Sequence, residues 1–505
     1  MYALPKGSVV AVVGSGAMGS GIAQVAASAG HQVLLYDTRP GAAGQAIAGI
    51  GEVYAKLVEK GRMGAVESDL ARERLKPVAS LQEAAQAALV VEAIVENLDA
   101  KRALFIELET IVADDCILAT NTSSISVTAI GAPLARPERL VGMHFFNPVP
   151  LMALVEVISG LATDRAVADT VYATAEAWGK NPVHARSTPG FIVNRVARPY
   201  YAEALRLLLE QAADVATLDA VMRDCGGFRM GPFELMDLIG HDVNFSVTSS
   251  VFAAYYGDQR FTPSVLQHEL VNAGFLGRKS GRGFYRYGDD VARLDAQTEP
   301  VVAHPPSIAH VGAPGQIESI AARLHNPGVT SGKPGFYCGG AAIYLTDGRS
   351  ATQRAADDGH ADTIVFDLLL DPAKATRIAL ARADGCGDAA WQAAVGLFQA
   401  AGFTVTRLDD VPGLAVMRTV AMLANEAADA VHQGVCSALA VDIAMQKGVN
   451  YPRGPLAWAD LIGLHHVVTV LSNLATTYGE DRYRVSPLLR RKLAANAHGA
   501  RFHAQ

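Results

Sequence analysis

The sequence predicts an α/β protein in which a doubly wound parallel sheet is followed by an all-α domain, a small degenerate α/β segment and a second all-α domain. Short apolar runs alternate with helical segments from Val9 to about residue 187. From Pro189 to about residue 285 the pattern is helical, and this block recurs from Pro412, at a constant offset of 223 residues. These observations predict a duplicated helical region attached to a sheet domain.

Length and composition exclude several classes of protein. The chain has 505 residues, enough for about three domains. Its 43 Lys and Arg against 50 Asp and Glu give a net charge of −7, which argues against nucleic acid or an anionic membrane as a partner. No apolar run approaches the ~18–20 residues of a membrane span, and the N-terminus lacks the pattern of a signal peptide. Five widely spaced cysteines fit a reduced, cytoplasmic protein.

The first strand leads into a glycine-rich loop. Val9–Val13 is a continuous apolar run, as in a parallel strand buried on both faces, and Gly14–Gly19 follows with the spacing GxGxxG. The next helix, Ser20–Ala29, stops at Gly30. This order is typical of a Rossmann-type dinucleotide site, where the helix N-terminus faces the pyrophosphate.

An acid at the end of the second strand indicates which dinucleotide binds. Val33–Tyr36 ends on Asp37, 18 residues after Gly19. A carboxylate there accepts the ribose hydroxyls and repels a 2′-phosphate, so NAD is favoured over NADP, although the nearby Arg39 weakens this preference. These residues alone leave open a glycine turn without a ligand, or a fold that binds FAD or S-adenosylmethionine.

The other elements follow from the same periodicities. Residues 41–75 carry helical spacing, further buried strands are expected at Leu89–Val95 and Ile117–Thr120, and residues 290–335, rich in Pro, Gly and His, are expected to be irregular. Short strands are expected again at 342–345, 363–366, 377–380 and 403–406. The expected domains are residues 1–187 (NAD-binding Rossmann domain), 188–287 (helical substrate and dimerisation domain), 288–340 (linker), 341–408 (small degenerate α/β segment) and 409–505 (second helical domain).

The helical block is an internal repeat. Asp-Leu-Ile-Gly occurs at Asp237–Gly240 and again at Asp460–Gly463, and Gly231-Pro232 matches Gly454-Pro455 at the same offset. Chance similarity between Ala-rich helices would not keep both motifs in register.

A histidine and a carboxylate stand on two adjoining apolar runs. His144 lies in Met143–Pro150, and Glu156 follows 12 residues later in Leu154–Ile158. Oxidation of an alcohol needs a group that takes the hydroxyl proton while hydride leaves carbon, and a histidine oriented by a carboxylate suits this task. A lone buried histidine is more often structural, but the paired Glu and the flanking Asn147-Pro148 favour the catalytic interpretation.

Several motifs in order resemble the 3-hydroxyacyl-CoA dehydrogenase family over residues 8 to about 287. The motifs are Gly14–Gly19, Val91–Asn97, Asn121–Ser124, His144–Pro148, Leu154–Val157 and Pro189–Arg195. The resemblance implies an NAD-dependent oxidoreductase that converts (S)-3-hydroxyacyl-CoA to 3-oxoacyl-CoA. Ser187–Tyr200, Val449–Trp458 and the second helical domain are similar to the long bacterial form, which acts in phenylacetate degradation on 3-hydroxyadipyl-CoA.

The resemblance also assigns roles by position. It makes His144 the general acid/base and Glu156 the residue that orients it, and it places Ser123 and Asn194 on the C3 oxygen or the adjacent thioester. No metal is implied. The implied cofactor contacts are Gly14, Gly16, Ala17, Met18, Gly19, Asp37, Glu96, Lys101 and Asn147.

Several of these residues have a plainer interpretation. Ser123 could cap a helix, Glu96 and Lys101 could form an exposed charged pair, and Asn194 could be an ordinary helix residue. The joint pattern outweighs these alternatives for Ser123 and Asn194, and less so for Lys101. The cations Lys56, Lys60 and Arg62 could meet the phosphates of coenzyme A or only solvate a helix face.

The acyl group and the second half leave alternatives open. Arg229 could bind a terminal carboxylate of a dicarboxylyl chain or lie on the surface, and the rival substrate is 3-hydroxybutyryl-CoA. A non-catalytic NAD-binding structural protein is the rival from another class.

Met417 replaces Asn194 in the repeat, and residues 341–408 contain neither a GxGxxG nor a matching His–Glu pair. We therefore expect one active site, with the helical domains forming either an intramolecular pseudo-dimer or, together with other copies, a homo-oligomer; an independent appended module is the alternative.

Overall fold

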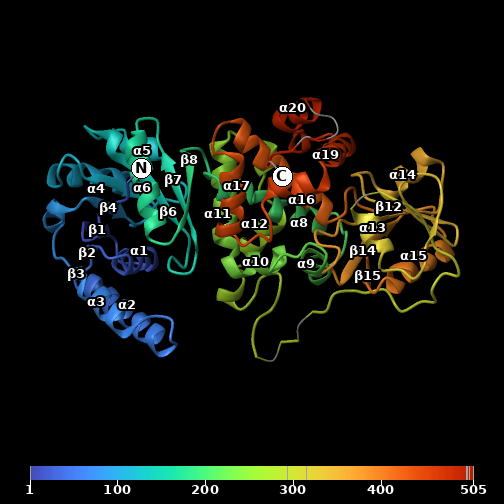
Figure 1. Ribbon diagram of the computed structural model, residues 1–505, viewed down its shortest axis with the longest axis horizontal. Coiled ribbons are helices and arrows are strands. Elements are labelled where there is room, and N and C mark those ends of the chain that lie inside the picture. The colour runs from blue at the N-terminus through green and yellow to red at the C-terminus, as the bar shows by residue number, and fades with distance from the viewer. Residues whose placement is uncertain are drawn as a thin grey trace. The chain divides into compact units, whose positions relative to one another are not determined.

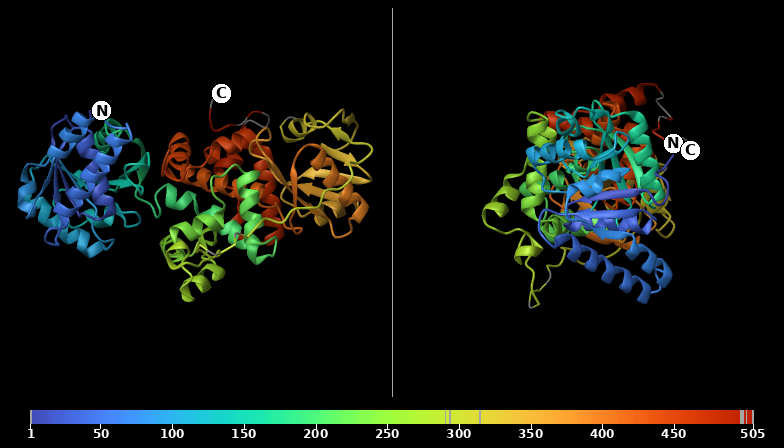
Figure 2. Two further views of the ribbon diagram at one scale, coloured as in Figure 1. Left: turned by 90° about the horizontal axis from the view of Figure 1, so that it is seen from below. Right: turned by 90° about the vertical axis from the view of Figure 1, so that its left-hand side faces the viewer.

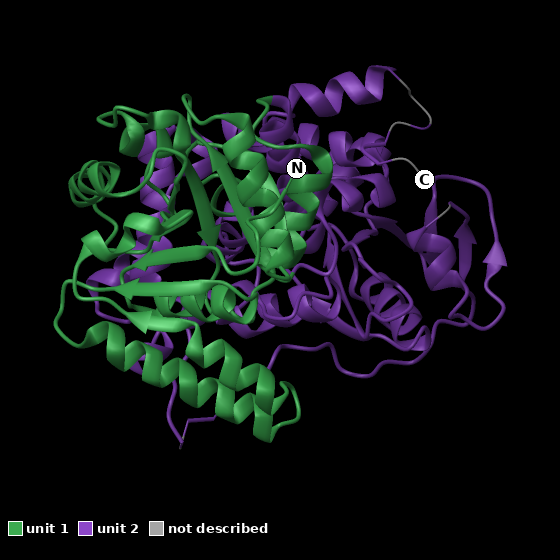
Figure 3. Ribbon diagram, turned by 60° about the vertical axis from the view of Figure 1, so that its left-hand side comes forward, with its two compact units in different colours: residues 1–195, 433–450 green, residues 196–432, 451–505 purple. Residues whose placement is uncertain are grey.

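The computed structural model describes residues 2–289, 291–292, 294–313, 315–495, 499 and 501–503 (Figure 1). The chain folds into two compact units, which Figure 3 shows in different colours. Unit 1 comprises residues 1–195 and 433–450, and unit 2 comprises residues 196–432 and 451–505.

An eight-stranded sheet forms the centre of unit 1. Its order is β3-β2-β1-β4-β5-β6-β7-β8, and all neighbours are parallel except β6 and β7. Apolar runs buried on both faces form its middle strands, which confirms the expected parallel sheet. The strands are β1 (Val9–Val13), β2 (Gln32–Tyr36), β3 (Leu75–Pro77), β4 (Leu89–Glu92), β5 (Ile117–Thr120), β6 (Leu140–Phe145), β7 (Leu154–Ser159) and β8 (Asn181–Arg186).

Helices cover this sheet (Figure 2). The main core of unit 1 lies between them and the strands and includes Val12, Ile22, Val91 and Phe145. The helices of unit 1 are α1 (Ala17–Ser28), α2 (Ala42–Glu59), α3 (Ala65–Glu73), α4 (Leu98–Ile111), α5 (Val127–Gly131), α6 (Arg165–Ala177) and α17 (Ala438–Gly448), and α7 (Val193–Val196) lies at its boundary.

The helix α17 comes from the second half of the chain, in the region expected to belong to the second helical domain. It packs on β7 and β8, and a Cβ on Gly448 would come within 2.6 Å of the Leu154 side chain. Just before α17, the Val435 carbonyl accepts a hydrogen bond from the Arg186 N–H (2.9 Å). Residues 433–450 therefore complete the core of a domain made mostly from residues 1–195.

The second sheet lies in unit 2 and has the order β10-β9-β11-β12-β13-β14-β15. Part of the expected linker, 288–340, belongs to this sheet, because β9, β10 and β11 extend it beyond β12. These strands have two to four residues each and were too short for a periodic pattern. The strands are β9 (Ala309–Val311), β10 (Gly328–Val329), β11 (Gly335–Cys338), β12 (Ala341–Leu345), β13 (Thr363–Phe366), β14 (Arg377–Arg382) and β15 (Thr404–Arg407).

The two helical repeats meet inside unit 2. Helix α8 of the first repeat packs on α16 of the second, and the buried Arg418 Nε binds the buried Glu203 Oε2 at 2.7 Å across this contact. The helices of unit 2 are α8 (Arg198–Leu209), α9 (Val215–Asp224), α10 (Pro232–Ile239), α11 (His241–Ala254), α12 (Val265–Asn272), α13 (Gln316–Ala321), α14 (Ala351–Asp358), α15 (Asp388–Ala400), α16 (Val416–His432), α18 (Pro455–Ile462), α19 (Leu464–Tyr478) and α20 (Pro487–Ala495).

The repeat reaches further back than the sequence motifs indicated. Adding 223 to the bounds of β7 and α6 gives the bounds of β14 and α15, and the start of β6 maps onto the start of β13. Each half therefore contains the same sheet edge, the same covering helix and the same helical domain.

Across the described residues, no single helix is both long and apolar enough to span a membrane; only α18 and α19 together, bent by 101°, reach that length and composition.

Candidate active site

The glycine loop lies between β1 and α1. Gly14 has φ +101°, and a Cβ there would lie 2.5 Å from the Ala93 carbonyl oxygen. A Cβ on Gly19 would lie 1.8 Å from the Gly14 carbonyl oxygen, so only glycine allows α1 to approach the strand so closely. Gly16 caps α1 without a side-chain hydrogen bond and has open space where a side chain would point. The first N–H groups of α1, from Ala17 and Met18 onward, are thus left to a ligand.

Asp37 lies beside this loop at the end of β2. Its carboxylate accepts hydrogen bonds from the Ser15 N–H (2.9 Å) and hydroxyl (2.6 Å), and both of its oxygens accept from the Arg39 guanidinium (3.0 and 3.1 Å). Arg39 is the main cause that holds the pKa of Asp37 well below its usual range. Asp37 is therefore ionised at neutral pH, as recognition of a ribose requires.

A cavity of about 760 Å³ opens over these residues. It is lined by Gly14, Gly16 and Asp37 at the loop and by Val95 and Leu104 further along the sheet edge. A glycine loop with open space, an uncapped helix N-terminus and a carboxylate at the next strand end together fit a dinucleotide. The residues present therefore suit NAD; a contact from Asp37 to its ribose remains a prediction.

Lys101 is buried, not part of an exposed pair. Its Nζ binds Glu92 Oε1 at 2.6 Å and Glu96 Oε2 at 3.2 Å, and Glu92 also accepts from the Thr120 hydroxyl (2.7 Å). Lys101 and Glu92 are almost fully buried. The sequence interpretation did not include Glu92; an acidic residue ending an otherwise apolar buried strand is the signal that could have found it.

Glu96 holds the loop that carries Ser123. Its Oε1 accepts hydrogen bonds from the Ser123 N–H (2.9 Å) and hydroxyl (3.2 Å), and from the hydroxyls of Thr122 (2.7 Å) and Ser124 (3.1 Å). Burial alone would raise the pKa of Glu96, but Lys101 and these donors hold it below its usual value. In unit 1 Glu96 is thus a carboxylate that positions Ser123; a contact from Glu96 to the cofactor remains a prediction.

His144 and Glu156 face each other across β6 and β7. They are direct partners in the antiparallel register, and His144 Nδ1 lies 2.7 Å from Glu156 Oε2, with both residues buried. A carboxylate oxygen accepts, so Nδ1 is the donor of this hydrogen bond, and in the neutral ring Nε2 carries the lone pair. Nε2 is then able to accept a proton from a substrate.

Glu156 has a second set of partners. Its Oε1 accepts the backbone N–H groups of Ile192 (3.0 Å) and Val193 (2.9 Å), at the start of α7. The carboxylate is therefore fixed from both sides, by the imidazole and by the chain that leads into α7.

The structure brings Asn194 to the same place. Its Nδ2 donates to the Ser123 carbonyl oxygen at 3.3 Å, so the amide lies beside the loop that Glu96 holds. Asn147 is exposed just after β6 and follows His144 by three residues. All thirteen residues singled out in the sequence lie in unit 1, whereas Arg229 is an exposed residue of unit 2.

The second half of the chain has lost the acid/base pair. At the 223-residue offset, Asp367 stands at the position of His144 and Ala379 at that of Glu156, and the Asp367 N–H donates to the Ala379 carbonyl. The Asp367 carboxylate accepts the N–H groups of Ala415, Val416 and Met417 (2.7–2.9 Å). The Asp367 carboxylate accepts hydrogen bonds from backbone N–H groups, and Ala379 offers no side chain for proton transfer. The positions of the acid/base pair are therefore used for a structural contact.

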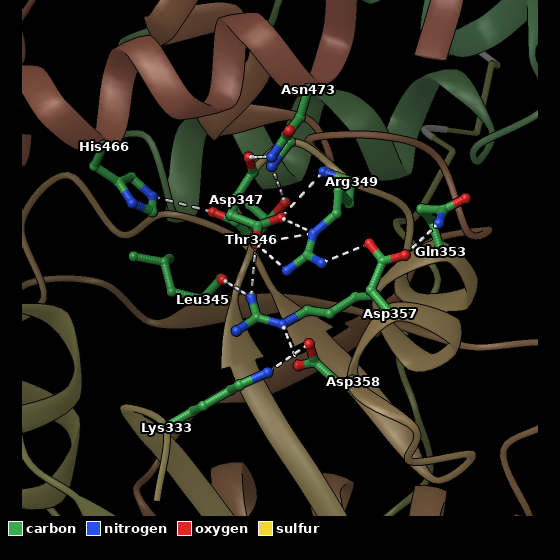
Figure 4. Close-up of polar contacts among 12 residues, drawn as sticks. Lys333, Leu345, Thr346, Asp347, Arg349, Gln353, Asp357, Asp358, His466 and Asn473 are labelled. Carbon is green, nitrogen blue, oxygen red and sulfur yellow. Dashed lines mark hydrogen bonds and ion pairs between the residues drawn. The ribbon is translucent and has the colours of Figure 1, made fainter. Parts of the chain in front are cut away.

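The loop equivalent to the Ser123 loop is also occupied by protein (Figure 4). Ala342 pairs with Thr363 as Leu118 pairs with Leu140, so by the sheet register Asp347 takes the place of Ser123. The Asp347 carboxylate binds Arg349 Nη2 at 2.6 Å and Arg354 Nη1 at 3.3 Å. From α19, His466 donates to the Thr346 carbonyl (3.1 Å) and Asn473 to that of Asp347 (2.9 Å). These contacts support the expectation that the second half holds no second active site.

Family models describe most of the chain. The NAD binding domain of 3-hydroxyacyl-CoA dehydrogenase matches residues 9–188, and its C-terminal domain matches twice, at residues 190–287 and 413–503. Residues 343–412 match the 3-hydroxybutyryl-CoA dehydrogenase reduced Rossmann-fold domain. The double match confirms the duplication of the helical domain.

Similar proteins share the length as well as the motifs. A 3-hydroxyadipyl-CoA dehydrogenase of Escherichia coli (strain K12) is 44% identical over 96% of this chain and 97% of its own length. A probable 3-hydroxybutyryl-CoA dehydrogenase of Bacillus subtilis (strain 168) is 44% identical over 55% of this chain and 96% of its own length. The crystal structure of 3-hydroxybutyryl-CoA dehydrogenase from Escherichia coli K12 has a TM-score of 0.90 and 42% identity, covering 98% of this chain and 99% of that one. With these matches and the geometry of unit 1, the chain belongs to the 3-hydroxyacyl-CoA dehydrogenase family, the NAD-dependent oxidoreductases of 3-hydroxyacyl-CoA thioesters.

Proposed function

We propose that this enzyme oxidises (S)-3-hydroxyadipyl-CoA to 3-oxoadipyl-CoA, as a step of phenylacetate degradation in the cytoplasm. The observation that carries the proposal is the 44% identity to the 3-hydroxyadipyl-CoA dehydrogenase of Escherichia coli along almost the whole of both chains. The five cysteines are free, which fits a reducing compartment.

The residues of unit 1 supply the acid/base chemistry. NAD, when bound, accepts the hydride that leaves C3 of the substrate. His144 Nε2 takes the hydroxyl proton as the C3 oxygen becomes a carbonyl, and Glu156 stabilises the imidazolium that forms. Ser123 and Asn194 donate to the C3 oxygen or the thioester carbonyl and hold the substrate in place.

The second candidate substrate is (S)-3-hydroxybutyryl-CoA. It is favoured by the matched crystal structure of a 3-hydroxybutyryl-CoA dehydrogenase, which has the same fold over nearly the whole chain. The adipyl chain carries a terminal carboxylate and one further methylene group in place of a hydrogen on C4 of the butyryl chain, so a cation that meets the carboxylate would separate the two substrates.

Steady-state kinetics with both thioesters test the proposal. NADH production should give a higher kcat/KM with 3-hydroxyadipyl-CoA than with 3-hydroxybutyryl-CoA, and with NAD than with NADP. A higher kcat/KM for the butyryl thioester would contradict the adipyl assignment. Arg229→Ala should lower the adipyl-to-butyryl ratio if this arginine binds the carboxylate, and an unchanged ratio would leave Arg229 without that role.

We also propose that the fused helical repeats replace the contact between two subunits. The packing of α8 on α16 and the buried Arg418–Glu203 pair support this, because both join the first repeat to the second within one chain. The alternative is a homo-oligomer built from these chains, which sedimentation of the full-length protein distinguishes.

A further inference from the structure

The repeat produces two equivalent sheet edges, and in unit 2 this edge carries an extended segment of the chain. Residues 297–299 lie along β15: the Glu299 N–H donates to the Val405 carbonyl (2.8 Å), and the Gln297 carbonyl accepts from the Thr406 hydroxyl (3.1 Å). Residues 300–302 continue along α15, where the Gln399 side chain bonds the Pro300 carbonyl (2.9 Å) and the Val302 N–H (3.0 Å). The segment is fixed further by α15, where the Trp391 indole donates to the Glu299 carboxylate (3.3 Å).

A helix forms the other wall of this edge. The Gln297 N–H donates to the Thr217 hydroxyl (2.9 Å), and its side-chain amide donates to Asp214 Oδ2 (2.8 Å), at the start of α9. The unit 2 groove between α15, β15 and α9 is therefore a site that holds an extended peptide segment by its backbone and side chains.

Unit 1 contains the same three walls. At the offset of 223 residues, α6 corresponds to α15, β8 to β15 and α17 to α9. The bond from the Arg186 N–H to the Val435 carbonyl repeats the bond from the Asp409 N–H to the Ala212 carbonyl, both 2.9 Å. The two sites share this backbone hydrogen bond. Their side chains differ, because Ala440, Val183 and Ala168 stand in place of Thr217, Thr406 and Trp391, so a segment in unit 1 would be held mainly by its backbone and its charge.

In unit 1 these walls enclose a groove of about 750 Å³. Its lining includes Pro182 and His184 of β8, Tyr172 of α6, and Leu439 and Ile443 of α17. The Asn181 N–H bonds the Ala153 carbonyl next to β7, so in the alternating ladder the carbonyl of Pro182 points to the outer edge of β8. It is the equivalent of the Val405 carbonyl that Glu299 uses, and outside the ladder no backbone N–H of the described residues donates to it. Proline lacks an N–H but keeps its carbonyl, so the acceptor that holds the segment in unit 2 is also present here.

The charge of the unit 1 groove differs from that of its counterpart. Arg186 stands at the position of Asp409, and no carboxylate pairs with its guanidinium among the residues that the structure describes. In unit 2 the segment runs antiparallel to the strand, with Glu299 at Val405. If a segment in unit 1 has its fifth residue at Pro182 in the same way, its first residue, four positions earlier, lies opposite Arg186. An acidic first residue is therefore the complement of this groove.

We propose that the groove between α6, β8 and α17 binds an extended peptide segment of a partner protein, with its backbone along the outer edge of β8 and a carboxylate side chain at Arg186. This is strand addition to an exposed sheet edge, in which main-chain bonds give affinity and flanking side chains give specificity. After its first six residues, the peptide in unit 1 must follow a different path from that of the segment in unit 2. There, Gly396 lets the Ala303 carbonyl approach to 2.4 Å from where a Cβ would lie, and α6 has Ala173 at that position.

Fluorescence anisotropy with two labelled peptides tests the proposal on the full-length enzyme. The probe is the nine-residue sequence of residues 295–303, Asp-Ala-Gln-Thr-Glu-Pro-Val-Val-Ala, and its analogue has Lys in place of the first Asp. We expect saturable binding of the probe below about 1 mM and about three- to tenfold weaker binding of the Lys analogue, as for a single exposed ion pair.

Two protein variants locate the binding. Arg186→Glu should reverse the preference between the two peptides and leave the dehydrogenase activity unchanged. Lys76→Glu on β3, the opposite edge of the same sheet, changes the net charge equally and should leave the preference as it is.

Hydrogen exchange distinguishes the two grooves. Protection on adding the probe should appear in residues 181–187 and 434–443. Protection in residues 404–409 would mean that the probe displaces the chain's own segment in unit 2, and it would overturn the proposal. Absence of saturable binding, or binding that Arg186→Glu does not alter, would overturn it as well.

Discussion

At the scale of single residues, the site of unit 1 depends on a histidine that is fixed before any substrate arrives. His144 Nδ1 lies 2.7 Å from Glu156, whose other oxygen accepts the N–H groups of Ile192 and Val193. This arrangement leaves Nε2 as the one atom of the pair that can exchange a proton with a substrate. In the proposed role of His144 as the base, the imidazole needs no reorganisation when the reaction begins.

Replacing the base tests that assignment. His144→Gln should lower kcat by about 10²- to 10⁴-fold, because the amide cannot take the hydroxyl proton. NAD binding, followed by isothermal titration, should stay unchanged, since Asp37 and the glycine loop are untouched. Full activity in this variant would remove the proposed mechanism.

A second residue-scale prediction concerns the cofactor. Asp37 neutralises Arg39 through two hydrogen bonds, at 3.0 and 3.1 Å. Asp37→Ser should release the guanidinium to meet a 2′-phosphate, so the ratio of kcat/KM for NAD over that for NADP should fall about tenfold or more. Arg39→Ala is the matched control and should keep or increase the preference for NAD.

At the scale of elements, the buried Asp367 carries out a structural task at the end of β13. Four backbone N–H groups donate to it, from Leu368 and from Ala415, Val416 and Met417. Full burial nevertheless raises its pKa from 3.8 to about 6. The folded chain thus binds a proton more tightly than the unfolded chain does.

The contribution of Asp367 to the free energy of unfolding of unit 2 should therefore fall as the pH rises from about 4 to about 6. The folded state holds the proton up to about pH 6, whereas the unfolded carboxyl loses it near 3.8, and the contribution is at most about 3 kcal/mol. Urea unfolding, followed by tryptophan fluorescence at several pH values, gives the free energy of unfolding. In Asp367→Asn this free energy should change less between about pH 4 and about pH 6 than in the unmodified protein. Asp219, whose pKa burial also raises to about 6, adds to the change in both proteins, so the difference between them is the test. Equal changes would contradict the assignment.

The sequence predicts most elements but not their partners. Buried strands such as Val9–Val13 and Ile117–Thr120 are confirmed because both faces of a parallel strand are apolar. The duplication predicts that α17 exists, yet α9 and α17 carry the same pattern, so nothing in it indicates that α17 packs on β8. Strands such as β11 depend on pairing with distant residues and have too few positions for a periodic signal.

In the candidate site, too, local motifs were predictable, whereas contacts between distant residues were not. The positions of motif residues such as His144 and Asp37 are predictable, because their spacing reflects the ends of strands, whereas their roles stay predictions. Glu92 was not identified, because its role depends on Lys101 folding back into the sheet. The exchange of Asp367 for His144 became visible only once the strands were aligned in space.

At the scale of the whole molecule, the two halves depend on each other. Truncation after residue 290 removes residues 433–450 from unit 1 and uncovers Leu154 and β8. The shortened chain should aggregate or associate with other copies, and its activity should fall. Sedimentation and the NADH assay test this; a soluble and fully active monomer would contradict the pseudo-dimer.

The position of α17 also has a consequence for how the protein is made. The N-terminal sheet leaves the ribosome early, but the helix that covers β7 and β8 is synthesised only near residue 450. At about 5–20 residues per second, the uncovered edge waits for tens of seconds. During that time the faces of β7 and β8 that α17 covers stay uncovered, so the first domain is complete only after the second half has been translated.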